Sequence, residues 1–137
     1  HNCLMPGRRP FQTIQPALAR LTDGRVMAYG TMGGEGQPQT QAAVFARHVL
    51  FGQDLQAAVT APRWLLGRNW GAETTTLKLE SRFDANVVLS LASAGHDIET
   101  VAPYSDLMGH AGALVHHPVG WLEGASDPRS DGSVAAF

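Results

Sequence analysis

Residues 30–40 read Gly30-Thr31-Met32-Gly33-Gly34-Glu35-Gly36-Gln37-Pro38-Gln39-Thr40, with four glycines among the first seven residues and an expected helix beginning at the proline. Glycine adopts positive φ and lets the main chain approach a ligand closely, so a Gly-Gly turn can direct successive N–H groups at one oxygen. A helix start attracts negative charge in the same way. The stretch therefore predicts either a backbone site for an oxyanion or carboxylate, or a tight strand-to-helix turn without a ligand.

The segments around this turn alternate between strand and helix patterns. Strands are expected at residues 16–21, 25–30, 74–80, 97–101, 111–116 and 120–125, with Asp23-Gly24 as the turn of the first hairpin. Helices are expected at residues 38–50, 54–61 and 84–95, with Asp54 and Asp84 as N-caps. The last helix should turn Val87, Val88, Leu91 and Ala92 to the core, and residues 63–71, which show no clear period, should form a loop. The sum is an α+β fold, a mostly antiparallel sheet with helices on one face.

The composition limits the classes of function. The chain has 137 residues, 44% of them hydrophobic, which suits a single domain spanning residues 1–137. A net charge of -2 argues against a nucleic-acid partner. Apolar runs fall short of the roughly 20 residues that span a bilayer, which argues against a membrane role. Cys3 is the only cysteine, so the sequence excludes an internal disulfide and a cysteine-based zinc site.

A sheet that is covered by helices on one side only needs a second layer on the other. We therefore expect the chain to be a fragment or a subunit. The uncovered face should associate with the rest of a longer protein or with another copy of the chain.

Several side chains offer chemistry. His110, His116 and His117 suggest a metal site, but adjacent histidines on a strand point to opposite faces and no acidic residue completes a known spacing, so no metal is expected. His110 lies on a glycine-flanked loop, where it either lines a pocket or packs within the turn. The segment 127–132 reads either as a salt-bridged turn, which we favour, or as a functional closing motif.

The segment 63–70 has two open interpretations as well. Trp64 and Trp70, with Arg63 and Arg68, form either the rim of a cleft or a set of side chains packed under a loop. In the first case Arg63 would contact a substrate carboxylate or a partner subunit. Cys3 has little support as a nucleophile, because no histidine stands at a recognisable spacing from it.

Six motifs together resemble the small subunit of γ-glutamyltransferases. They are Pro6-Gly7-Arg8-Arg9-Pro10, Gln12-Thr13-Ile14-Gln15-Pro16, Asp23-Gly24, the turn from Gly30 to Gly34, Asp54-Leu55-Gln56-Ala57-Ala58-Val59 with Ala61-Pro62-Arg63, and Gly124-Ala125-Ser126-Asp127-Pro128-Arg129. Each motif is weak by itself, but six in register are specific. The resemblance runs from about Asn2 to the C-terminus.

The resemblance implies an N-terminal-nucleophile hydrolase with an αββα sandwich, of which this chain supplies a part. The family's precursor cuts itself to expose a threonine, which is the nucleophile and, through its α-amine, part of the base. The threonine forms an acyl-enzyme with a γ-glutamyl amide and passes the acyl group to water, an amino acid or a peptide. By position, Gly33 and Gly34 match the glycine pair whose amides stabilise the oxyanion. No cofactor is implied.

The chain departs from the family pattern in two respects. The nucleophile belongs upstream of Pro6, so we expect the chain to lack activity by itself and to need the large subunit and the N-terminal part of the small subunit as partners. Where family members carry a Ser-Ser pair that binds the glutamyl carboxylate, this chain has Gln12-Thr13, which makes a different and bulkier pocket. Residues 31–40 also look like the branch that includes amidohydrolases of other small acids, so the small-molecule amide that is cleaved stays open.

The competing interpretation is a binding or scaffold module with the same half-fold, which holds an anion without chemistry. An enzyme requires an upstream segment with a threonine in the parent gene, whereas a module does not. The compartment stays open between the periplasm or secretion, common in the family, and the cytoplasm.

Overall fold

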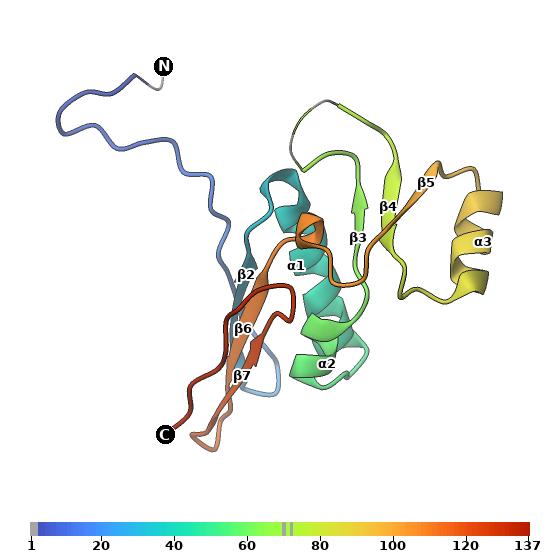
Figure 1. Ribbon diagram of the computed structural model, residues 1–137. Coiled ribbons are helices and arrows are strands. Elements are labelled where there is room, and N and C mark those ends of the chain that lie inside the picture. Colours follow the sequence, from blue (N-terminus) through green and yellow to red (C-terminus); the bar gives the residue numbers. More distant parts are fainter. Residues whose placement is uncertain (1–2, 70, 72) are drawn as a thin grey trace.

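The computed structural model describes residues 3–69, 71 and 73–137, which form an α+β fold with two β-sheets (Figure 1). The larger sheet is antiparallel in the order β1-β2-β6-β7 and consists of β1 (Ala17–Arg20), β2 (Val26–Thr31), β6 (Ala111–His116) and β7 (Leu122–Ser126). The smaller sheet has the order β3-β4-β5 and consists of β3 (Trp64–Leu66), β4 (Leu77–Glu80) and β5 (Ile98–Val101). The expected fold class is confirmed.

The helices begin at the residues that their capping chemistry predicts. A short 3-10 helix η1 (Gly34–Gly36) leads into α1 (Gln37–Phe45), which continues as the π-helical turn η2 (Ala46–Leu50) and so fills the expected helix at 38–50. Asp54 caps α2 (Leu55–Thr60) by accepting a 2.9 Å hydrogen bond from the Ala57 amide. Asp84 caps α3 (Ala85–Ser93) through the Asn86 amide at 2.8 Å. A second 3-10 turn, η3 (Asp106–Met108), precedes β6.

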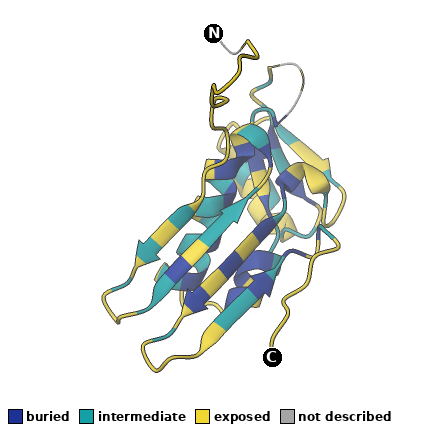
Figure 2. Ribbon diagram, turned by 90° about the vertical axis from the view of Figure 1, so that its left-hand side faces the viewer, coloured by how far each residue is buried: buried dark blue, intermediate teal, exposed yellow. Residues whose placement is uncertain are grey.

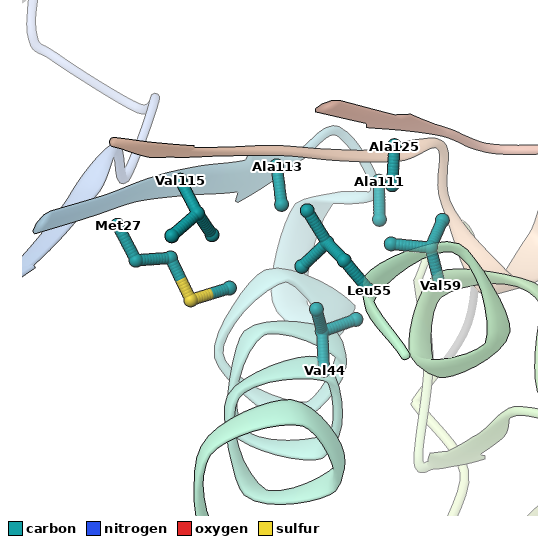
Figure 3. Close-up of a cluster of buried hydrophobic side chains, with 8 residues drawn as sticks. All are labelled: Met27, Val44, Leu55, Val59, Ala111, Ala113, Val115 and Ala125. Atoms are coloured by element: carbon teal, nitrogen blue, oxygen red, sulfur yellow. The ribbon is translucent and has the colours of Figure 1, made fainter. Parts of the chain in front are cut away.

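The core lies between the larger sheet and the helices α1 and α2, which cover the same face of that sheet (Figure 1). Every second residue of β6 is buried, as expected for a strand with one covered face. The side chains that meet there are Met27, Val44, Leu55, Val59, Ala111, Ala113, Val115 and Ala125 (Figure 3). Full burial of each larger apolar side chain contributes about 1.5–3 kcal/mol, so this cluster fixes the helices on the sheet.

The opposite face of the larger sheet is open and partly apolar (Figure 2). Leu18, Ala28 and Leu114 lie side by side across β1, β2 and β6, and the two leucines are 67% and 56% exposed. Near β7 the C-terminal residues 133–135 approach the sheet, because a Cβ atom on Gly124 would lie 2.8 Å from the Val134 side chain. The rest of this face lacks a second layer among the described residues.

Two expectations about the smaller sheet were wrong. Residues 63–71 contain β3, which pairs antiparallel with β4. A strand of three residues is too short to show an alternation of apolar and polar side chains, so the sequence did not predict it. The strand expected at 74–80 begins only at Leu77. β4 and β5 pair in parallel because α3 forms the crossover between them.

The helix α3 is less buried than its pattern predicts. None of its described residues is fully buried, and Val87, expected in the core, is 43% exposed. α3 lies at the outer edge of the molecule beside the smaller sheet, where only one layer of chain faces it (Figure 1). Val88 and Leu91 are half-buried there, whereas Ala92 is exposed. Among the described residues, no helix has both the length and the apolar character needed to cross a membrane.

Candidate functional site

The glycine turn connects β2 to α1 and has a backbone that only glycine adopts readily. Gly33 has φ 130° and ψ 32°, and Gly34 has φ 50°. The turn closes through a 2.9 Å hydrogen bond from the Gly36 amide to the Gly33 carbonyl. Within the described part of the chain, the amides of Gly33 and Gly34 donate no backbone hydrogen bond.

A second glycine-containing loop lies directly behind this turn. Gly109, with φ 73°, follows η3, and a Cβ atom there would overlap the Met32 carbonyl oxygen and lie 2.8 Å from Thr31 Oγ1. The Met32 amide donates to the His110 carbonyl at 3.3 Å, which joins the two loops. The backbone before Gly33 is therefore in contact with a loop that is almost eighty residues away in the sequence.

Side chains from three parts of the fold hold this second loop. Asn69 Nδ2 donates to the Leu107 carbonyl at 3.0 Å, and Thr40 Oγ1 donates to the Met108 carbonyl at 3.2 Å. Arg63 Nη1 donates to the Met108 and Gly109 carbonyls at 3.3 and 3.0 Å. Asn69 also fills the space beside the glycine turn, because its Oδ1 would lie 2.9 Å from a Cβ atom on Gly34.

Arg63 belongs to a buried network of two arginines and two carboxylates. Its Nη2 lies 2.6 Å from Asp127 Oδ2, and Arg129 Nη1 lies 3.0 Å from the other Asp127 oxygen. Arg129 also forms a two-pronged ion pair with Glu80, with its Nε 2.7 Å from Oε1 and its Nη2 2.5 Å from Oε2. Buried charges of this kind are stable only when they are fully paired, so the network fixes the ends of β4 and β7 relative to the loop behind the glycine turn.

Burial and pairing shift the ionisation of this network in opposite directions. Burial lowers the pKa of Arg63 to about 10, against the opposing charge of Asp127. Burial would raise the pKa of Asp127, but the charge of Arg63 and hydrogen bonds from the backbone amides of Ala111 and Arg129 hold it below its ordinary value. Arg63 and Asp127 are therefore both charged at neutral pH.

Two sequence interpretations are settled by this network. The segment at Asp127 and Arg129 is a salt-bridged turn, as favoured. The interpretation of Arg63 as part of the rim of a cleft is wrong, because Arg63 is 1% exposed and all its partners belong to the chain's own interior. Trp64 is partly exposed on β3, Arg68 pairs with Glu35 at 3.0 Å on the surface, and Trp70 lies outside the described residues.

An open cavity of about 680 Å³ lies in front of the glycine turn. The N-terminal segment, the end of β2, the start of α1 and the loop after η3 line it, through Thr13, Ile14, Gln15, Pro16, Gly30, Thr31, Met32, Gly33, Gly34, Gln37 and His110. None of these side chains is an acid, lysine or arginine. The fold thus brings Thr13, His110, Gly33 and Gly34 to one cavity, while Gln12 is exposed beside it with its Nε2 3.4 Å from the Ile14 carbonyl.

The three histidines do not gather. His110 is half-buried at the cavity, and its Nε2 is shielded from solvent with no hydrogen-bond partner among the described residues. His116 is exposed on the open face of the sheet, and His117 stacks on Trp121 and lies 3.0 Å from Glu123 Oε2. In the described ranges, no three His, Cys, Asp or Glu side chains form a group that could hold a metal ion.

Sequence reasoning missed the side chains that support the turn. Gln37, Thr40, Asn69 and Glu80 are all buried polar residues. Their partners lie far away in the sequence, up to 68 residues for Thr40, so no local spacing could reveal them. The one available signal was a polar residue at a position that should face the core. Glu80, which is buried at the end of β4, is such a residue.

Known proteins match this chain along its whole length. The model of the family described as γ-glutamyltranspeptidase matches residues 1–137. The chain is 58% identical to an oxamate amidohydrolase proenzyme of Klebsiella pneumoniae, over 98% of the chain and 25% of that protein. It is 42% identical to the glutathione hydrolase-like YwrD proenzyme of Bacillus subtilis, over 99% of the chain and 26% of that protein. The chain thus spans about a quarter of the length of these relatives.

A solved structure agrees with the sequence matches. A highly active mutant of the γ-glutamyltranspeptidase of Pseudomonas nitroreducens superposes with a TM-score of 0.72 and 25% identity, covering 99% of this chain and 68% of that one. The family match, the two relatives and the shared fold lead to one conclusion: the chain belongs to the γ-glutamyltranspeptidase family.

Proposed function

We propose that this chain is part of an amide hydrolase or acyltransferase in which the amides of Gly33 and Gly34 form the oxyanion hole. The observation that carries the proposal is the pair of backbone amides of Gly33 and Gly34, which line the cavity and donate no backbone hydrogen bond within the described residues. Their backbone conformation is one that only glycine adopts readily. Donors of this kind act on the charge that develops in the transition state, and one of them contributes about 2.7–4 kcal/mol.

The nucleophile in this proposal is the N-terminal threonine of a processed precursor and comes from another part of the protein. Its hydroxyl attacks the amide carbon, and its own α-amine takes the proton. The tetrahedral oxyanion then lies against Gly33 and Gly34. Its collapse breaks the C–N bond, the α-ammonium returns its proton to the leaving nitrogen, and the released amine leaves an acyl-enzyme for water or an acceptor. Residues 1–137 act as one domain that is inactive without the rest of the precursor.

The substrate is proposed to be the amide of a small acid. Thr13 and His110 line the cavity and can donate hydrogen bonds to an acid group, with Gln12 at the exposed edge. None of the described residues that line the cavity is a lysine or arginine, so a free carboxylate would depend on these neutral donors or on the missing part of the precursor. The relative with 58% identity is named for its action on oxamate, which fits an acid smaller than a γ-glutamyl group.

The test uses the full-length precursor. Intact-mass measurement and N-terminal sequencing should find a cleaved product whose smaller chain begins with threonine and contains this sequence. That product should hydrolyse oxamate in preference to γ-glutamyl-p-nitroanilide. Alanine at position 33 keeps the amide but does not readily adopt φ 130°, so Gly33→Ala should displace this donor and lower kcat about 10²–10³-fold with KM little changed.

The alternative is a non-catalytic anion-binding module. An uncleaved product without turnover of either amide, yet with anion binding that Gly33→Ala abolishes, would favour that alternative and contradict the proposal.

A further inference from the structure

Residues 11–16 carry Thr13 to the cavity without belonging to a strand or helix. Phe11 and Ile14 are both exposed, so apolar packing does not fix the segment. Within the described part of the chain, its hydrogen bonds to the rest of the fold come from Gln37 and Gln41 on α1. These two glutamines therefore determine where the segment lies.

Gln37 holds the segment at two points with one carboxamide. Its Nε2 donates to the Thr13 carbonyl at 3.1 Å, and its Oε1 accepts from the Gln15 amide at 3.3 Å. The side chain thus replaces a neighbouring strand, which would also donate to one backbone group and accept from another. Gln37 is 7% exposed, so water does not compete freely for these bonds. Gln41 adds one bond from its Nε2 to the Gln15 carbonyl.

The place of Gln37 in the chain links this clamp to the glycine turn. Gln37 is the first residue of α1 and follows Gly34 after a single turn of 3-10 helix. The backbone amides proposed for the oxyanion and the clamp on Thr13 are thus parts of one short, continuous segment. The distance between the oxyanion site and the Thr13 side chain depends on that segment.

We propose that Gln37 is a positioning residue for substrate binding, which sets Thr13 at a fixed distance from Gly33 and Gly34. The inference rests on the proposed function, since it assumes that Thr13 contacts the substrate. Gln37 acts through the Thr13 backbone and takes no part in the chemical step. Its loss should therefore weaken substrate binding and spare the chemical rate.

The chain offers a matched control in Gln56. This residue on α2 clamps the β7 backbone in the same manner, with Nε2 2.8 Å from the Ser126 carbonyl and Oε1 3.1 Å from the Ser126 amide. Gln56 does not line the cavity in front of the glycine turn. A change that removes the donor therefore deletes a side-chain bond to a backbone carbonyl in both variants, at a buried position for Gln37 and at an exposed position for Gln56.

The experiment compares Gln37→Glu with Gln56→Glu in the processed full-length protein. A carboxylate at position 37 still accepts from the Gln15 amide but repels the Thr13 carbonyl. Loss of one hydrogen bond changes binding by roughly 3- to 10-fold, so Gln37→Glu should raise KM for oxamate by about that factor with kcat nearly unchanged. Gln56→Glu should leave both constants unchanged. Equal KM effects in the two variants, or a fall in kcat without a rise in KM for Gln37→Glu, would overturn the inference.

Amide hydrogen exchange gives a second readout that does not need turnover. Peptides that cover residues 11–16 should exchange faster in Gln37→Leu, which removes the acceptor of the Gln15 amide, than in the unchanged protein, and at the unchanged rate in Gln56→Leu. If the unchanged protein cleaves no amide, the proposed function fails while this exchange difference still tests the clamp. Equal exchange in all three proteins would refute the clamp itself.

Discussion

Replacing Gly109 by alanine tests whether the loop behind the glycine turn sets the position of the oxyanion donors. Gly109 has φ 73°, and its Cβ would overlap the Met32 carbonyl oxygen, with Thr31 Oγ1 only 2.8 Å away. Backbone is the obstacle, so the strain cannot be relieved by rotating a side chain. The Met32–Gly33 peptide must move, or the loop must move away from it.

The magnitude follows from the geometry. Real Cβ atoms stay at least 3.0 Å from such atoms, so the overlap requires a displacement on the order of 1 Å, and a 1 Å misplacement lowers catalysis about 10²-fold. That factor corresponds to about 2.7 kcal/mol in the activation barrier. The effect should fall on kcat, because the amides act on the transition state more than on the bound substrate.

The matched control is Gly52→Ala. Gly52 has a similar φ of 66°, but a Cβ there meets no atom within 4 Å. Both variants should lose about 1–3 kcal/mol of stability from the φ strain, and only Gly109→Ala should lose activity. Steady-state kinetics and thermal unfolding of the processed full-length protein measure both effects. A folded Gly109→Ala protein with unchanged kcat, or an equal loss in Gly52→Ala, would refute the reasoning.

Three further predictions concern stability. Arg63→Met should lower the free energy of unfolding by about 3–5 kcal/mol in urea titrations, because it leaves buried acceptors unpaired; a loss below 1 kcal/mol would show that the network rearranges. The pKa of Asp127 is lower in the folded state, so its stabilisation is present above the unfolded pKa of about 3.9 and is lost as pH falls below that value. Asp127→Asn should flatten this acid limb in unfolding measurements from pH 2 to 7 more than Asp23→Asn does, because Arg25 also lowers the pKa of Asp23 but that ion pair is exposed to solvent. Asp54→Ala should lower the free energy of unfolding by about 1 kcal/mol, because it removes the N-cap of α2. An unchanged midpoint of urea unfolding would contradict that role.

Local chemistry explains which elements could be predicted from the sequence. The Asp23-Gly24 hairpin, and the helices capped by Asp54 and Asp84, depend on hydrogen bonds and turn conformations among residues a few positions apart. β3 could not be predicted, because its strand character comes from pairing with β4. The burial of α3 was overestimated. The apolar face of a helix shows which side chains could be buried, but their actual burial depends on which elements pack beside the helix.

The candidate site divides in the same way. Gly33 and Gly34 were predicted to form a special turn because their conformation is a property of the glycine backbone, and both indeed have positive φ. Arg63 stayed open between a rim and packing under a loop, because an arginine is usually exposed and its partners Met108, Gly109 and Asp127 lie 45 to 64 residues further along the chain. Gln37 gave no signal, since a glutamine at a helix start is ordinarily a solvated residue.

The sequence by itself determined the helices, every strand except β3, the glycine turn and the family resemblance, because each depends on residue type and on spacing along the chain. Only the tertiary structure decided that the strands divide into two sheets, that Arg63, Glu80, Asp127 and Arg129 form one buried network, and that Gln37 holds Thr13 beside the turn. The physical reason is that a buried charge or amide is stabilised by partners in space. The identity of those partners is set by the packing of the whole chain.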